Sequence, residues 1–232
     1  MIWRRRAVSD LEAEWVIDRF AWLVTTLGPR TFFRHTRLVL PTQRYFPDGL
    51  GGAGVRPGPL FDEIRAYLGV NHWPVKLVEL PDGPGLSQPI AGTFYEDEEG
   101  PAIVSYNPGL LKRPNAFIGT MAHELSHYIL APHVESAPGG ESEHEELTDL
   151  AVIYAGFGLI DLLASRDQSR HGYLTTSVRA YALATFLRLK AVDAAVCGPY
   201  MSGGLQRALA RALAQRDDRA DELVILKGMD GR

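Results

Sequence analysis

The sequence predicts an α+β fold: a small antiparallel or mixed sheet packed on one helix, followed by a mostly helical C-terminal half. Short runs with the composition of strands are confined to residues 74–106. Helical periodicity appears over 8–27 and again at several places after residue 115. With 232 residues, of which 46% are hydrophobic, the chain can bury a substantial core, so we expect one domain over 1–232.

The N-terminal part divides into a helical segment over 1–40 and a Pro- and Gly-rich loop over 41–60. The loop contains the formal G-x-G-x-x-G pattern of Gly49 to Gly54. A dinucleotide site needs that pattern between a strand and a helix, and we expect Pro57 and Pro59 to prevent the helix. We therefore predict no nucleotide cofactor.

The core of the domain is expected over 61–215, with a charged, frayed tail over 216–232. A short helix is predicted first, at 61–68. Three strands are predicted next, the last two joined by the acidic turn Glu96 to Pro101: 74–80, 93–95 and 102–106.

The pentapeptide His123-Glu124-Leu125-Ser126-His127 forms an H-E-x-x-H pattern in a predicted helix over 116–130, which Asn115 is expected to cap. In a helix the two His lie at i and i+4, so both imidazoles project from one face. That face is nearly opposite an apolar stripe, formed by Ile118, Ala122, Leu125 and Ile129. The spacing suits tetrahedral Zn²⁺, and Glu124 is placed to act as general base on a water that the metal activates.

Two His cannot hold zinc alone, so a third ligand is required. Glu145 is the preferred candidate, because it opens a second helix on which Glu145 and Asp149 lie together at i and i+4. Asp149 would then orient a ligand His through its remaining ring N–H. His133 is a second candidate at the spacing of a metzincin, although Leu130 occupies the place where that pattern has Gly. Glu146 and Asp149 itself are the remaining candidates for the third ligand.

With both motifs in place, the chain resembles the gluzincins, the thermolysin-like zinc metallopeptidases, whose signature is H-E-x-x-H followed by E-x-x-x-D on the next helix. The two halves stand here as His123–His127 and Glu145–Asp149, and the resemblance covers about residues 90–165. The stretch 145–152 also resembles a group of bacterial metallopeptidases of undefined substrate. The resemblance implies a zincin-like fold in which an edge strand aligns a peptide across the metal, and we expect 103–106 to be that edge. It supplies no counterpart for the catalytic His that thermolysin takes from a later domain.

Three further helices are expected after the first motif, at 145–163, 176–196 and 205–214. The first of them becomes apolar on all sides after its first turn, so we expect it to be central to the fold. Gly156 and Gly158 would allow a neighbouring helix to approach it closely.

A donor for the developing oxyanion is sought among Tyr173, Tyr181 and His171, which follow the metal-binding pair. Cys197 has no partner pattern that would make it a nucleophile. Solvent-exposed or capping roles are expected for three other histidines, His35, His72 and His144.

The composition excludes several classes of function. A formal net charge of −4 argues against nucleic-acid binding, and the Arg4–Arg6 cluster is too short to reverse it. Cys197 is the only cysteine, which suits a reducing compartment. The first twenty residues lack an apolar signal-peptide core, and the longest apolar run, Leu150 to Ile160, is too short to span a bilayer. We expect a soluble, cytoplasmic protein that binds neither nucleic acid nor membranes.

The expected function is that of a zinc metallopeptidase of narrow specificity, acting on a peptide or protein and restrained by a narrow cleft or a regulatory partner. Two different functions stay open beside it. One is that of a catalytically silent zinc-binding regulatory module, and the second is that of a metallohydrolase of a non-peptide amide or ester.

Overall fold

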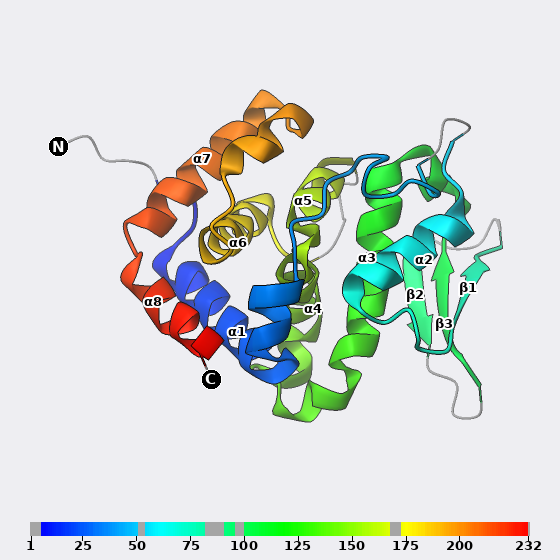
Figure 1. Ribbon diagram of the computed structural model, residues 1–232, viewed down its shortest axis with the longest axis horizontal. Helices are drawn as coiled ribbons and strands as arrows, with labels where there is room; N and C mark the ends of the chain where they lie inside the picture. The colour runs from blue at the N-terminus through cyan, green and yellow to red at the C-terminus, as the bar shows by residue number, and fades with distance from the viewer. Residues whose placement is uncertain (1–5, 51–53, 82–90, 96–99, 168–172, 232) are drawn as a thin grey trace.

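The computed structural model describes residues 6–50, 54–81, 91–95, 100–167 and 173–231 (Figure 1). A small sheet lies at one end of the molecule, and helices from both ends of the chain pack together at the other end (Figure 1). Two helices, α3 (Pro114–Leu130) and α4 (His144–Val152), lie between these two parts. The fold is α+β, with a mostly helical C-terminal half, as the sequence predicts.

The sheet has three described strands, β1 (Val75–Glu79), β2 (Gly92–Tyr95) and β3 (Ala102–Tyr106), in the order β1-β3-β2. It is mixed, because β1 pairs with β3 in parallel and β2 pairs with β3 antiparallel. Helix α3 packs on β2 and β3. The prediction that 103–106 forms an edge strand was wrong: β3 is buried along most of its length and lies in the centre. The edge strand beside α3 is β2.

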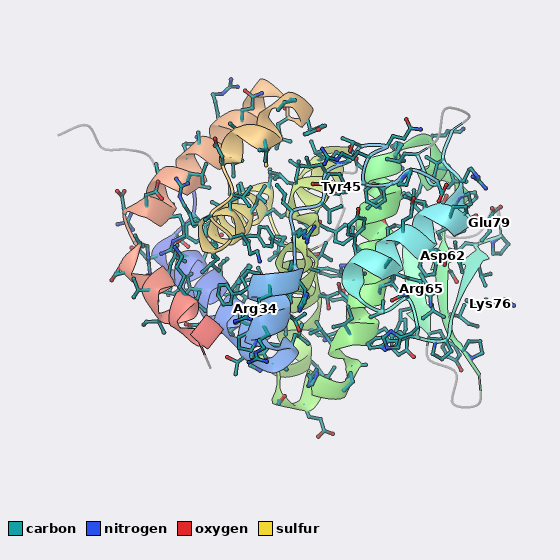
Figure 2. All side chains as sticks on the ribbon, viewed as in Figure 1. Arg34, Tyr45, Asp62, Arg65, Lys76 and Glu79 are labelled. Carbon is teal, nitrogen blue, oxygen red and sulfur yellow. The ribbon has the colours of Figure 1, made fainter. Side chains whose placement is uncertain are left out.

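The two edges of the sheet differ in character. Strand β1 carries the exposed charged residues Lys76 and Glu79, which Figure 2 shows at the outer edge of the molecule. Charged side chains of this kind protect a sheet edge against pairing with another strand. Strand β2 has none, and its residues Gly92 to Phe94 line a cavity instead. Among the described strands, the sheet edge without charged side chains is therefore β2.

Helix α1 (Asp10–Leu27) begins two residues later than predicted, because Ser9 and Glu12 form a capping box there. Helix α2 (Pro57–Leu68) begins four residues earlier than predicted. The expectation that Pro57 and Pro59 prevent a helix was wrong, since a proline in the first turn removes no hydrogen bond that the helix needs.

The loop before α2 therefore ends at Arg56 rather than at residue 60. Its G-x-G-x-x-G pattern follows no strand in the described part of the chain, although residues 51–53 lie outside the described residues. Arg65 of α2 ties the helix to the turn that leads into β1, where its guanidinium donates to the carbonyl oxygens of Asn71 at 2.9 Å and Trp73 at 2.5 Å (Figure 2).

Helix α3 begins with Pro114 in its first turn, so its cap is Arg113 and not the predicted Asn115. Three members of the predicted apolar stripe, Ile118, Ala122 and Leu125, have no exposed surface, and the fourth, Ile129, is half-buried. They belong to a hydrophobic cluster with α2, β3 and Phe157. This packing fixes the rotation of α3 about its axis and with it the direction in which the opposite face points.

The helix predicted over 145–163 is in fact two helices, α4 and α5 (Gly158–Asp167), joined by a π-helical turn at Ile153–Phe157. Gly156 interrupts them with a φ of +98°, which favours glycine. A Cβ at this residue would lie 2.0 Å from the carbonyl oxygen of Arg37, so the close neighbour there is a loop and not a helix. Gly158, in contrast, faces Leu183 of the next helix, as predicted.

The C-terminal helices are α6 (Thr176–Leu189), α7 (Gly203–Asp217) and α8 (Asp221–Lys227). Helix α6 ends seven residues before the predicted 196, because the chain turns at Ala191, whose φ is +51°. The prediction of a frayed tail over 216–232 was also wrong. Arg216 is fully buried and donates hydrogen bonds to Tyr181 at 2.8 Å and Glu222 at 2.5 Å, which fastens α8 to α6.

One stretch, Gly140–Ser165, is long and apolar enough to cross a membrane, which exceeds the predicted apolar run of Leu150 to Ile160. Its most apolar window is 89% buried inside the protein. It is also not one continuous helix, because Gly156 breaks it. The segment is therefore only weak evidence for a membrane span, because a mostly buried core helix has the same length and composition.

Candidate metal centre

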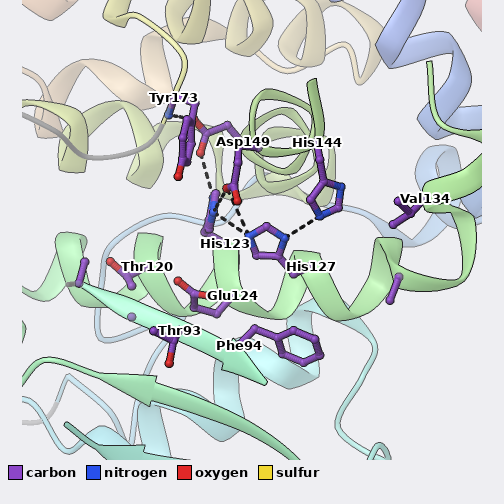
Figure 3. A pocket seen from close by; sticks show the side chains of 14 residues that line it. Thr93, Phe94, Thr120, His123, Glu124, His127, Val134, His144, Asp149 and Tyr173 are labelled. Atoms are coloured by element: carbon purple, nitrogen blue, oxygen red, sulfur yellow. Dashed lines mark hydrogen bonds and ion pairs between the residues drawn. The ribbon is translucent and has the colours of Figure 1, made fainter. Parts of the chain in front are cut away.

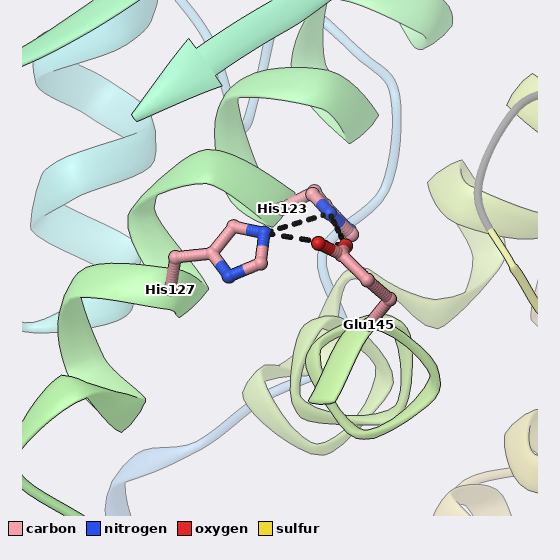
Figure 4. A group of neighbouring side chains, drawn as sticks. All are labelled: His123, His127 and Glu145. Atoms are coloured by element: carbon pink, nitrogen blue, oxygen red, sulfur yellow. Dashed lines mark hydrogen bonds and ion pairs between the residues drawn. The ribbon is translucent and has the colours of Figure 1, made fainter. Parts of the chain in front are cut away.

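Three side chains from α3 and α4 converge on one point (Figure 4). The Nε2 atoms of His123 and His127 lie 3.1 Å apart, and Oε2 of Glu145 lies 3.3 Å from the first and 3.4 Å from the second. Among the described residues, these three form the group of His, Cys, Asp and Glu side chains that could hold a metal ion. They are the ligands that the sequence favoured.

The spacing can be compared with what a metal requires. Zinc–ligand bonds to His and carboxylate are about 2.0–2.2 Å long, and a tetrahedron with arms of that length has edges of roughly 3.3 Å. The three interatomic distances of 3.1, 3.3 and 3.4 Å match such edges. Two imidazole nitrogens and one carboxylate oxygen therefore have the mutual spacing of three corners of a zinc-sized tetrahedron, and all three residues line the cavity beside them.

Asp149 contacts Nδ1 of His123, the ring nitrogen that does not face His127 and Glu145. Its Oδ1 lies 3.0 Å from Nδ1 of His123, and its Oδ2 accepts hydrogen bonds from the backbone N–H groups of Tyr173 at 2.6 Å and Leu174 at 2.9 Å. The buried Arg179 donates to the same oxygen at 2.6 Å and to Asp161 at 2.8 Å. Asp149 is thus itself fixed by several donors, and through it the imidazole of His123 is oriented.

His127 has a corresponding neighbour in His144, whose Nε2 lies 3.0 Å from Nδ1 of His127. Thr148 lies 3.4 Å from the same Nδ1 and donates to the carbonyl oxygen of His144 at 2.8 Å. The capping role predicted for His144 is present at the end of the turn Gly140–Glu143, but its side chain has a contact that the sequence did not predict. It lines the cavity with the metal-binding group (Figure 3).

A cavity of about 570 Å³ opens beside the three ligands. Its walls are α3, α4 and the edge strand β2, and Figure 3 shows Glu124 between the imidazoles and β2. Only 8% of Glu124 is exposed. Gly92 of β2 makes this contact close, because a Cβ there would lie 3.1 Å from Cγ of Glu124 and 2.7 Å from Cγ2 of Thr120.

The charged groups at the centre shift one another's pKa values. Burial alone would lower the pKa of His123, but hydrogen bonds to Asp149 and Glu145 outweigh it and raise the value to about 10. The two imidazoles hold the pKa of Glu145 well below its usual range. Burial raises the pKa of Glu124, against the opposing effect of the same imidazoles. The carboxylates of Asp149 and Glu145 thus stabilise a positive charge between the side chains of the cluster, and a bound metal cation would supply that charge.

Of the other candidates for the third ligand, Asp149 contacts Nδ1 of His123 and not the cluster of Nε2 atoms, and two lie elsewhere. His133 is in a 3₁₀ turn at Ala131–Ser136, and neither it nor Glu146 is among the residues that line the cavity. Of the predicted oxyanion donors, Tyr173 lines the cavity and stacks on His123, with 6.4 Å between the ring centroids. Tyr181 is buried against Arg216, away from the cavity, and His171 lies outside the described residues.

Two residues of the cavity were not singled out from the sequence, namely His144 as a partner of the centre and Thr120. The hydroxyl of Thr120 is buried and has no hydrogen-bond partner among the described residues. The position of Thr120, one helical turn before Glu124, is a signal that could have found it. Cys197 is buried, and burial raises its pKa to about 11, so the thiol is held in its unreactive form.

No family model, no curated protein and no solved structure matches this chain. The function must therefore be argued from the geometry of the site.

Proposed function

We propose that this chain is a zinc-dependent hydrolase with a zincin-like active site, and that its substrates are peptides. The observation that carries the proposal is the tetrahedral spacing of His123, His127 and Glu145 next to the buried Glu124. A structural zinc site would close all four positions with protein ligands. Here only three protein ligands are present among the described residues, and the cavity beside them also contains the carboxylate of Glu124, which is not one of the three.

The donor set favours zinc among the common divalent metals. Two imidazoles and one carboxylate in a tetrahedral arrangement are typical of catalytic zinc, whereas magnesium and calcium prefer six or more oxygen ligands. When bound, the zinc ion would supply Lewis-acid activation of a water molecule and of the scissile carbonyl.

In this proposal Glu124 moves the proton. Its carboxylate accepts a proton from the attacking water and later delivers it to the nitrogen of the leaving amine. The low exposure of Glu124 keeps bulk water from competing for that proton. The hydroxyl of Tyr173 points into the same cavity in Figure 3, and we assign it the role of hydrogen-bond donor to the developing oxyanion.

The edge strand β2 supports a peptide as the substrate. A peptide could pair with its main chain by strand addition and would then pass directly over Glu124 and the two imidazoles. A substrate that is a small non-peptide amide or ester would make no use of this edge.

We further propose that the enzyme acts in the cytoplasm and is selective. The single buried cysteine suits a reducing compartment. A cytoplasmic peptidase must be restrained, and we propose that a narrow cleft or a regulatory partner does this. Rapid degradation of casein by the purified protein would contradict this restraint.

The first experiment measures metal content by elemental analysis in the wild type, Glu145→Ala and His133→Ala. We expect one zinc per chain, lost in Glu145→Ala and retained in His133→Ala. Loss in His133→Ala alone would move the third ligand to His133, and absence of zinc from the wild type would overturn the proposal.

The second experiment tests catalysis with a peptide library and the Glu124→Gln variant. We expect hydrolysis by the wild type and a rate roughly 10²- to 10⁴-fold lower in Glu124→Gln, with unchanged zinc content. Zinc binding without any hydrolysis of peptides, amides or esters would favour the regulatory module instead. Cleavage of small amides or esters alone would overturn the assignment of a peptide substrate.

A further inference from the structure

A second cavity, of about 500 Å³, lies on another face of the metal-bearing helix. Ser126 and Ile129 of α3 line it, whereas His123, Glu124 and His127 line the first cavity. Its other walls come from α2, from residues 31–39 and from α4 with the π-helical turn that follows. The volume is in the range of pockets that bind small molecules, which is about 300–1,000 Å³.

The deep end of this cavity is apolar and is kept open by small residues. Ser126 and Ala151 lie on its floor and are buried, and the half-buried Ala155 follows one turn later. Larger side chains at these positions would fill the space. The cavity is therefore a consequence of residue choice along α3 and α4, and not of a gap between loops.

A buried polar group without a partner belongs to the same floor. Tyr154 is 4% exposed, and its hydroxyl oxygen has no hydrogen-bond partner among the described residues. An aliphatic chain offers this hydroxyl no hydrogen bond, so what Tyr154 contributes to the floor is the apolar surface of its ring. Tyr154 lies in the π-helical turn, and turns of this type occur frequently at functional sites.

The mouth of the cavity is polar and basic. Arg37 and His35 line it and are exposed, and among the described residues no carboxylate pairs with the guanidinium of Arg37. Between mouth and floor the walls are apolar, with Leu27, Trp73 and Ile129 half-buried. The gradient from a cationic rim to an apolar floor is complementary to an amphipathic anion.

We propose that this cavity binds a single-chain aliphatic carboxylate, with the carboxylate at Arg37 and the chain on the floor formed by Ser126, Ala151 and Tyr154. The chain buries apolar surface against the floor, which supplies most of the affinity. The carboxylate forms a charge-assisted hydrogen bond with the guanidinium, which supplies selectivity for an anion. This inference does not depend on the proposed hydrolase activity.

The test is calorimetric titration of the full chain as purified, with any zinc that it carries, with decanoate below its micelle concentration and with 1-decanol as the uncharged control. Saturating acetohydroxamate is present throughout, so that the carboxylate cannot bind to the zinc ion. We expect saturable binding at one site and binding about tenfold weaker in Arg37→Gln, which corresponds to about 1.4 kcal/mol. The matched control is Arg30→Gln, an exposed residue outside the cavity, which should bind like the wild type.

A second set of variants tests the location. Ala151→Leu fills the floor and should abolish binding. If that variant does not fold by circular dichroism, Ala66→Trp at the exposed rim replaces it, with the same expected loss. Three results would each overturn the proposal: no saturable binding by the wild type, equal affinity in Arg37→Gln, or unchanged binding in the folded cavity-filling variant.

Discussion

Nδ1 of His123 lies 3.0 Å from Oδ1 of Asp149, while Oδ2 of the same carboxylate receives the guanidinium of Arg179 at 2.6 Å. The two carboxylate oxygens of the buried Asp149 thus connect the imidazole of His123, a candidate metal ligand, to the fully buried guanidinium of Arg179. Arg179 also holds Asp161, so it carries two carboxylates in the core. The arrangement fixes the ring of His123 with Nε2 directed at Glu145 and His127.

The first prediction concerns that connection. Asp149→Asn should lower zinc affinity about 10- to 100-fold, because the neutral amide orients the imidazole poorly and makes it a weaker ligand. Competition with a chelator measures the change. Asp161→Asn is the matched control, since Asp161 pairs with the same Arg179 but does not touch His123. An equal loss in both variants would show that Asp149 acts through the stability of the fold.

The second prediction concerns His144. His144→Ala should lower zinc affinity about tenfold while one zinc per chain is retained at saturation, because Nδ1 of His127 loses the neighbour that orients it. Glu146→Ala, on the same helix but outside the cavity, should have no effect. Loss of the zinc stoichiometry in His144→Ala would make His144 a ligand instead.

The third prediction concerns the contact between β2 and Glu124, the proposed general base. In Gly92→Ala the new Cβ would lie 2.7 Å from Cγ2 of Thr120, 3.0 Å from the carbonyl oxygen of Ser105 and 3.1 Å from Cγ of Glu124. Thr120 or β2 must shift, and Glu124 must give way by a few tenths of an ångström, so kcat/KM should fall on the order of tenfold to a hundredfold with zinc content unchanged. Gly58→Ala, where a Cβ meets nothing within 4 Å, is the control. Full activity in Gly92→Ala would argue against Glu124 as a precisely placed base.

The fourth prediction is a dependence of stability on pH. Glu143, two residues before Glu145, accepts hydrogen bonds from Trp15 at 2.7 Å and from Arg19 at 2.7 Å. Burial alone would raise the pKa of Glu143, but these donors outweigh it and lower the value. A carboxylate with a lowered pKa stabilises the fold above its unfolded pKa, and this contribution is lost as the pH falls through its folded pKa.

Glu143→Gln should therefore destabilise the protein at pH 7, by about 1 kcal/mol or less, and the difference from the wild type should disappear as the pH falls through the lowered pKa of Glu143. Urea titrations followed by tryptophan fluorescence measure both values. Glu141→Gln, an exposed residue of the same short turn, should show no difference at either pH. A difference for Glu143→Gln that stays constant with pH would contradict an ionic origin.

Local spacing predicted a large part of the site. His123, Glu124 and His127 lie on one helix, so their relative positions follow from helical periodicity alone. Glu145 and Asp149 likewise lie one turn apart on one helix. Because zinc requires a third ligand, the sequence predicts that this helix lies against the helix of His123 and His127. The strand positions were also readable, because alternation and flanking turns are local properties.

The remaining features depend on contacts between distant segments. The contact between His144 and His127, the pairing of Arg179 with two aspartates and the central place of β3 arise only when the helices and strands pack. Gly156 is instructive, because the residues around it have helical periodicity. Its break is imposed by the carbonyl of Arg37, more than one hundred residues earlier in the sequence.

The buried, interrupted segment Gly140–Ser165 has a consequence for how the protein is made. It packs against α1 and α3, which leave the ribosome before it, but also against α6, which follows it. Until α6 has been synthesised, the apolar surface around Gly158 that Leu183 of α6 contacts in the folded protein stays exposed in the nascent chain. Ribosome-bound chains that end before residue 176 should therefore recruit chaperones or aggregate, whereas chains that extend past α6 should not.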